Sequence, residues 1–154
     1  MRLQMSLPKF ERKDMAKNKS LRLVIDTNLW ISFIISNKLN QLERILLAEN
    51  TKILFSSELI EELQATITKP KLQKYFSENA LEEMLTVFDP YIDFISVKST
   101  VSICQDPNDN FLLGLAKDGK ANYLLTGDND LLDIGNYEKT IIIKISEFLE
   151  QIKN

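Results

Sequence analysis

Short apolar runs alternate with helical patterns along most of this chain, and this alternation limits the fold more than any other feature. Strand-like runs rich in branched side chains occupy 20–26, 51–55, 91–97, 121–125 and 140–145. Such alternation is typical of a mostly parallel sheet joined by right-handed crossovers. The sequence therefore predicts an α/β fold, a three-layer α/β/α sandwich with a central parallel sheet.

The segments between these runs have helical periodicity and recognisable helix ends. We expect helices at 40–49, 57–68, 78–88, 108–118 and 146–153, and an apolar stretch at 29–35. The residue before a proline is pushed out of helical space, so Pro70 and Pro90 should end two of these helices. Ser77 and Ser146 are predicted N-caps.

Length and composition predict one domain. The 154 residues, 44% of them hydrophobic, support a single core, which we place at 21–154. The single cysteine excludes a disulfide framework. The chain has neither a secretory signal nor the run of about 20 apolar residues that a membrane span needs, so we expect no membrane association and a cytoplasmic location.

Residues 1–20 differ in charge from the rest of the chain. They carry six basic and two acidic groups, whereas the remainder has 13 basic and 20 acidic groups. We interpret 1–20 as a basic, disordered N-terminal extension. A start assigned too early, with Met15 as the true one, and an added contact for RNA or a partner are the alternatives. The acidic body is unusual for a protein that binds nucleic acid by electrostatics alone.

Four acidic residues fall where this fold would gather them. Asp26 and Asp128 follow predicted strands, and the carboxyl ends of parallel strands form the edge where open α/β sheets bind ligands. Glu62 lies in the first two turns of the helix after strand 51–55, and Asp109 lies in the first turn of helix 108–118. We expect all four to converge on one pocket.

Clustered carboxylates need a cation. Two unit charges ~4 Å apart repel by about 4 kcal/mol at an effective dielectric of about 20. All-oxygen ligands suit Mg²⁺ or Mn²⁺, and a chain with no histidine and one cysteine is a poor zinc binder. Asn28 and Thr126 flank two of the acids and could orient them by hydrogen bonds.

Each acid also has an ordinary structural explanation. Asp106 followed by Pro107 resembles a helix start, with Asp106 as the N-cap. Asp128 and Asp130 are common turn residues, and Glu62 could be one acid on a solvated helix face. These explanations stay open for each residue taken alone, and the shared location favours the metal site.

A basic and aromatic segment follows helix 57–68. Lys69, Lys71 and Lys74 precede Tyr75 and Phe76, a combination that suits phosphate contacts and base stacking along a single strand. The alternative is a helix-end surface with both aromatic rings tucked into the core.

The chain resembles the PIN-domain family, specifically its branch of toxin components of bacterial toxin–antitoxin systems. The likeness runs from about 21 to 149 and is carried by motifs in the following order: Val24-Ile25-Asp26-Thr27-Asn28, then 57–63 with Lys69-Pro70-Lys71, then 106–110 with Ala116, and finally 125–132.

The resemblance implies a Mg²⁺- or Mn²⁺-dependent ribonuclease acting on single-stranded RNA, often a homodimer and often silenced by a small antitoxin protein. By position, the residues that match the acidic quartet of the family are Asp26, Glu62, Asp109 and Asp128. Asp130 matches a further acid that would join the metal ligands, and Thr126 a hydroxyl near the metal. Asp106 and Asn28 would support the ligands.

Two other functions stay open. One is a non-catalytic RNA-binding or scaffold protein with a PIN-like fold. The other is a metal-dependent phosphatase on a similar sheet, although the segment beginning at Asp26 lacks the second aspartate of the haloacid-dehalogenase-like motif.

Overall fold

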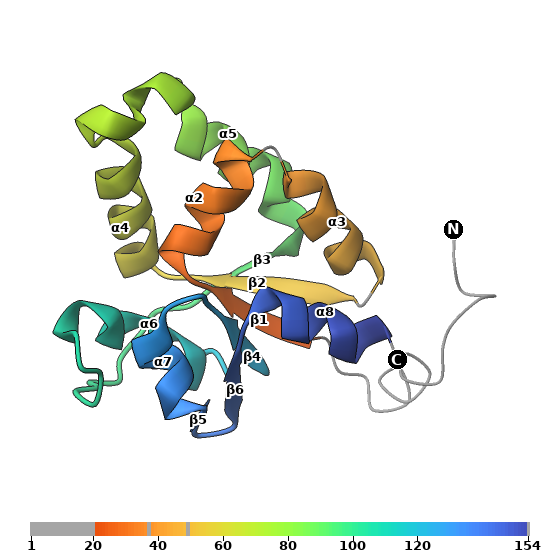
Figure 1. Ribbon diagram of the computed structural model, residues 1–154, viewed down its shortest axis with the longest axis vertical. Coiled ribbons are helices and arrows are strands. Elements are labelled where there is room, and N and C mark those ends of the chain that lie inside the picture. The colour runs from red at the N-terminus through yellow and green to blue at the C-terminus, as the bar shows by residue number, and fades with distance from the viewer. Residues whose placement is uncertain (1–20, 37, 49, 154) are drawn as a thin grey trace.

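The computed structural model describes residues 21–36, 38–48 and 50–153 (Figure 1), so the predicted N-terminal extension lies outside the described residues. A six-stranded sheet has the order β3-β2-β1-β4-β6-β5. The strands are β1 (Leu21–Ile25), β2 (Thr51–Phe55), β3 (Ile92–Phe94), β4 (Tyr123–Leu125), β5 (Asn136–Tyr137) and β6 (Thr140–Ile143). Every neighbouring pair is parallel except the antiparallel pair β5–β6.

Helices cover both faces of this sheet. They are α2 (Thr27–Ile35), α3 (Leu39–Ala48), α4 (Ser57–Ile67), α5 (Ala80–Phe88), α6 (Asn110–Asp118), α7 (Asn129–Ile134) and α8 (Ile145–Lys153). Short 3-10 helices are η2 (Pro70–Tyr75), η3 (Asp89–Tyr91) and η4 (Pro107–Asp109). Helices α2 to α5 lie on one side of the sheet and α6 and α7 on the other (Figure 1), so the predicted three-layer α/β sandwich is confirmed. Across the described residues, no helix is long and apolar enough to cross a bilayer.

The core sits around the central strands. Residues 23–25 of β1 and 53–55 of β2 are fully buried because helices cover both faces of the sheet. Trp30 of α2 is also fully buried, with its ring centroid 5.6 Å from that of Phe55 and 5.8 Å from that of Phe88. Its indole nitrogen has no hydrogen-bond partner in the described part of the chain.

The strand predicted at 91–97 is mostly wrong. Only Ile92–Phe94 forms a strand beside β2. The amide of Ile95 still donates to the carbonyl of Phe55 (2.8 Å), and the residues after it are not assigned to a strand. Val97 lies over Gly114 of α6, where an added Cβ would come within 3.2 Å of its Cγ1. The carboxylate of Asp118 holds the same segment by accepting hydrogen bonds from the amide of Lys98 and from the amide (2.8 Å) and hydroxyl of Ser99. We call residues 95–104 the strap.

Several helix boundaries also differ from the predictions. Helix α4 is capped by Ser56 and stops before Pro70 as expected, but Asn79, not Ser77, occupies the N-cap position of α5. Helix α6 begins at 110 after the turn η4, and α8 begins at 145, one residue before its predicted cap. The elements that were not predicted include helix α7 at 129–134, the antiparallel strand β5 and the 3-10 helices η2 and η3, and the apolar stretch at 29–35 proves to be part of helix α2.

Candidate active site

Asp26 is fixed between two strands and a helix. It follows β1, its amide donates to the carbonyl of Leu125 (3.0 Å), and it is the N-cap of α2. Its Oδ1 accepts from the amide of Asn28 (3.3 Å) and its Oδ2 from the hydroxyl of Thr126 (2.6 Å). Asp26 is buried, with 7% of the residue exposed. Burial raises the pKa of Asp26, the bond from Thr126 lowers it, and the charge of Asp128 raises it.

Thr126 joins the two strand-end acids. It is buried at the end of β4, where its amide donates to the carbonyl of Ile143 (3.1 Å). Its hydroxyl donates to Asp26 and accepts from the amide of Asp128 (3.0 Å). One side chain therefore sets the relative positions of both acids, as the sequence suggested.

Asp128 starts helix α7. Its Oδ1 accepts from the amide of Asp130 (3.0 Å), so it acts as an N-cap. Asp130 lies in the first turn of α7 and is partly buried. Asp128 was explained as an ordinary turn residue. Its side chain does accept a bond from a nearby amide, as in a turn, but it begins a helix instead of an isolated turn.

Asp109 lies close to Asp128 but comes from a different segment, the start of helix α6. It ends η4 and occupies the N-cap position of α6. Its pKa is raised to about 7, first by burial, then by the hydrogen bond with Asp128 and its charge, and then by the charges of Asp106 and Asp26. Asp106 caps η4, accepting from the amide of Asn108 (3.0 Å) as its sequence context predicted.

Cys104, which was not among the predicted site residues, lies next to this group. Its amide donates to Oδ1 of Asn110 (3.0 Å), which ties the end of the strap to the start of α6. The pKa of Cys104 is raised to about 11, first by burial and then by the charges of four neighbouring acids, Asp109, Asp128, Asp106 and Asp130. Apart from the short separation between Cys104 and Asp106, no sequence pattern indicated this contact.

Glu62 is not brought into the group. Its side chain is exposed on α4, and its charge is not among those that raise the pKa of Asp26, Asp109 or Cys104. We name the set formed by Asp26, Asp109, Asp128 and Asp130 the acidic group.

The predicted RNA-binding lysines lie apart on η2 and the residue before it. Lys69, Lys71 and Lys74 are exposed. The Nζ atom of Lys74 lies 5.2 Å from the ring centroid of Tyr75, which is 48% exposed, whereas Phe76 packs against the core. Of the two aromatic rings, Phe76 therefore packs against the core and Tyr75 does not.

The acidic group does not form a ready-made cage. No set of three or more Asp, Glu or Cys side chains among the described residues is arranged to hold a metal ion. The donor chemistry nevertheless fits Mg²⁺, which keeps several waters and binds through one or two carboxylates plus substrate phosphates. Asp109 and Asp128, held close enough to raise a pKa, are such a pair.

A cavity of about 490 Å³ opens beside two of these acids. Its lining residues are Asp26, Asn28, Leu29, Ser32, Gly127 and Asp128. The site thus combines carboxylates at strand ends with space for a ligand, the arrangement expected at the carboxyl edge of an open α/β sheet.

The chain belongs to the PIN-domain family, because the profile of the PIN domain matches residues 22–130. This confirms the resemblance seen in the sequence. PIN domains are generally nucleases and typically use divalent metal ions.

Known proteins similar to this chain include the following two. The uncharacterized protein MJ1680 of Methanocaldococcus jannaschii is 28% identical over 144 residues, which cover 86% of this chain and 92% of that protein. The crystal structure of VapBC2 from Rickettsia felis shows this complex bound to a DNA fragment from its promoter. It matches this chain with a TM-score of 0.52 and 19% identity. That match covers 79% of this chain and 97% of the other, and at this identity it shows the fold alone.

Proposed function

We propose that this protein is a Mg²⁺- or Mn²⁺-dependent endoribonuclease that hydrolyses phosphodiester bonds of single-stranded RNA. The observation that carries the proposal is the close approach of Asp109 and Asp128 beside Asp26, with the pKa of Asp109 raised to about 7. A protein that holds like charges together in this way gains stability when a cation neutralises them. Membership of a nuclease family supports the reaction class.

Asp109 and Asp128 would hold the ion directly, and Asp26 and Asp130 are the further proposed ligands, whose side chains would have to move to complete the set. When bound, such an ion supplies charge neutralisation and a water of lowered pKa for attack on phosphorus. Glu62 belongs to the proposed catalytic set by its position in the family motif, and it needs a separate test because its side chain lies outside the acidic group.

The remaining site residues position these acids and the substrate. Thr126 fixes one carboxylate oxygen of Asp26 and the start of α7 together. The amide of Asn28 fixes the other oxygen, and Asp106 shapes the turn that presents Asp109. The three exposed lysines around η2 would contact RNA phosphates, which would offset the acidic net charge of the chain.

The products follow from the available side chains. The chain has no histidine, so imidazole acid–base cleavage through the 2′-hydroxyl is not available to it. We expect products with a 5′-phosphate and a 3′-hydroxyl. End-group analysis that finds a 2′,3′-cyclic phosphate would contradict this mechanism.

The test is cleavage of unstructured and hairpin RNA by purified protein with Mn²⁺ and with EDTA. We expect Mn²⁺-dependent cleavage of the unstructured RNA, abolished in Asp128→Asn. Asp133→Asn, an exposed aspartate on α7, is the matched control and should cleave normally. Equal cleavage by wild type and Asp128→Asn would exclude the proposed enzymatic function and favour a non-catalytic RNA-binding protein. Glu62→Gln, run in parallel, tests the fourth acid.

We further propose that the protein acts in the cytoplasm as the toxin of a toxin–antitoxin pair, as a homodimer with a small antitoxin partner. The fold likeness to VapBC2 supports this proposal. Induced expression should arrest growth, the product of an adjacent small gene should relieve the arrest, and Asp128→Asn should not cause it. Normal growth under induction of active enzyme would count against a toxin.

A further inference from the structure

The cavity beside the acidic group has one charged end and one neutral end. Helix α2 supplies the neutral wall, and none of its nine residues, Thr27–Ile35, is charged. Asn28, Leu29 and Ser32 line the cavity from one side of this helix, because residues three and four apart on a helix are neighbours. Gly127 also lines the cavity and leaves space, since nothing lies within 4 Å of where its Cβ would be.

This division matches the two parts of a nucleotide. A phosphate would lie at the acidic end, where a cation offsets the carboxylates. The α2 wall instead offers an apolar surface at Leu29 and a hydroxyl at Ser32, which suit the face and the polar edge of an uncharged base. The volume of about 490 Å³ lies within the roughly 300–1,000 Å³ typical of small-ligand sites.

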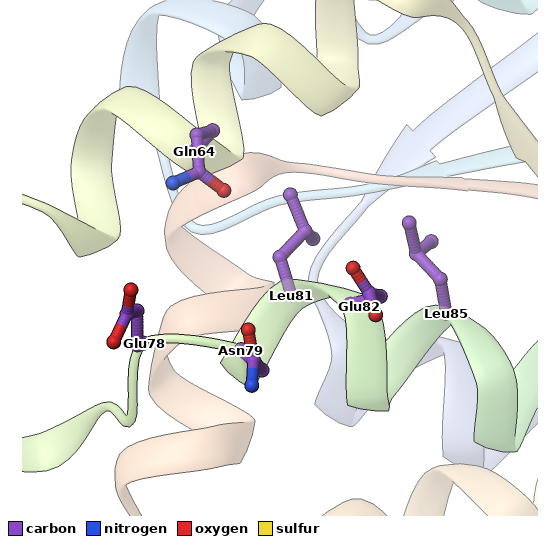
Figure 2. Close-up of a pocket in the computed structure, with 6 residues that line it drawn as sticks. All are labelled: Gln64, Glu78, Asn79, Leu81, Glu82 and Leu85. Atoms are coloured by element: carbon purple, nitrogen blue, oxygen red, sulfur yellow. The ribbon is translucent and has the colours of Figure 1, made fainter.

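A second cavity in the structure lacks this division. It measures about 240 Å³ and lies between α4 and α5, where Gln64 faces the first turns of α5 (Figure 2). Its charged lining residues, Glu78 and Glu82, are both acidic, and both are exposed. These charges would repel a phosphate chain, so the cavity between α4 and α5 is a suitable place for a control substitution.

We propose that the cavity beside Asp26 and Asp128 binds the nucleobase next to the scissile phosphate, with Leu29 against its face and Ser32 reading its polar edge. This inference rests on the proposed ribonuclease function, and it adds a determinant of base preference that lies outside the acids. Asn28 lines the same wall, but its amide already fixes Asp26. Ser32 is therefore the residue whose substitution separates base reading from the placement of the acids.

The experiment compares Ser32→Leu, which fills the cavity, and Ser32→Ala, which removes the hydroxyl, with Gln64→Leu as the control in the other cavity. Each variant cleaves four unstructured RNAs that differ only in the bases around one site. We expect a base preference in the wild type. Ser32→Leu should lower kcat/KM for the favoured base by about tenfold, and Ser32→Ala should flatten the preference, because a site built to hydrogen-bond a group rejects analogues that cannot pair. Gln64→Leu should keep the wild-type preference.

Binding gives a second measurement, independent of cleavage. The four ribonucleoside 5′-monophosphates are titrated with Mg²⁺ into the full-length labelled protein while the amide NMR signals of Leu29 and Ser32 are followed. Shifts in wild type that disappear in Ser32→Leu support the subsite even if no RNA is cut, in which case the ribonuclease proposal alone fails. Cleavage with the same preference in both Ser32 variants, or the absence of shifts at these two amides, overturns the subsite.

Discussion

The closeness of Asp109 and Asp128 should lower the stability of the metal-free protein above neutral pH. The pKa of Asp109 is raised to about 7 from 3.8, so the native state holds a proton that the unfolded chain has lost. The contribution of Asp109 to stability should therefore be most favourable below about pH 4, fall as pH rises towards 7, and stay low above it. Asp109→Asn removes this penalty, because an amide is neutral at every pH and can still donate to Asp128.

The size of the effect follows from the two pKa values. The difference corresponds to about 4 kcal/mol for the ionised form if it is fully felt. Asp109 is partly exposed, and solvent screening reduces the figure to about 2 kcal/mol. For a domain of this length the change should raise Tm by roughly 4–8 °C at pH 8, and by much less at pH 4.

The assay is thermal unfolding by circular dichroism in EDTA at pH 4 and pH 8, with Asp133→Asn as the control. Added Mg²⁺ should raise the Tm of the wild type more than that of Asp109→Asn, because a ligand that binds the native state more tightly stabilises it more. The reasoning is refuted if Asp109→Asn is no more stable than Asp133→Asn at pH 8. A gain of equal size at both pH values would refute it too.

Three other perturbations test the surroundings of the site. Thr126→Val leaves the buried carboxyl of Asp26 without its hydroxyl donor and should lower the free energy of unfolding in urea by about 1–3 kcal/mol. Thr126→Ser keeps the hydroxyl and should recover most of this loss. Equal losses in both variants would contradict the role of the Thr126 hydroxyl in holding Asp26. The raised pKa of Cys104 leaves less of it as the reactive thiolate at pH 8, and the higher nucleophilicity of that thiolate offsets only part of the loss. Cys104 should therefore react with iodoacetamide at pH 8 roughly tenfold more slowly than a free thiol. Mg²⁺ should speed the reaction by neutralising the neighbouring acids, and a rate equal to that of a small thiol would show that these charges are not felt. Asp118→Asn should release the strap and speed hydrogen exchange at the amide of Ser99. The hydrogen bonds from the strap lower the pKa of Asp118. Their contribution to stability should therefore be present above the ordinary aspartate pKa of 3.8 and be lost only as pH falls below it.

The parallel sheet and its acidic edge could be predicted because buried central strands are nearly continuous apolar runs. The runs at 21–25 and 51–55 are such strands, and each is followed by a polar residue at the sheet edge. The topology then places Asp26 and Asp128 together without further information, because β1 and β4 are neighbours.

The strap could not be told from a strand by its pattern. Residues 95–101 alternate between half-buried and exposed side chains, which is the period of a strand. Here the alternation comes from packing on α6, and no partner strand follows. Periodicity reports which side of a segment is covered, but it does not report whether a ladder or a helix covers it.

Helix α7 was missed for a related reason. Asp, Asn and Gly favour turns and also favour the first position of a helix, because in both places a side chain accepts a bond from a nearby amide. Asp128 makes this bond to Asp130 at the start of α7. The position of Glu62 was equally undetermined, since helical phase alone does not fix where an exposed side chain lies.

The buried indole of Trp30 gives the protein a natural optical reporter. The chain has a single tryptophan, so its entire indole emission arises at one place in the apolar interior. The amide of Trp30 donates to the carbonyl of Asp26 (3.1 Å), which links the fluorophore to this proposed metal ligand by one turn of helix. Binding of the proposed cation at the acidic group should therefore change the emission of Trp30, which can be measured in unlabelled protein without attaching a dye.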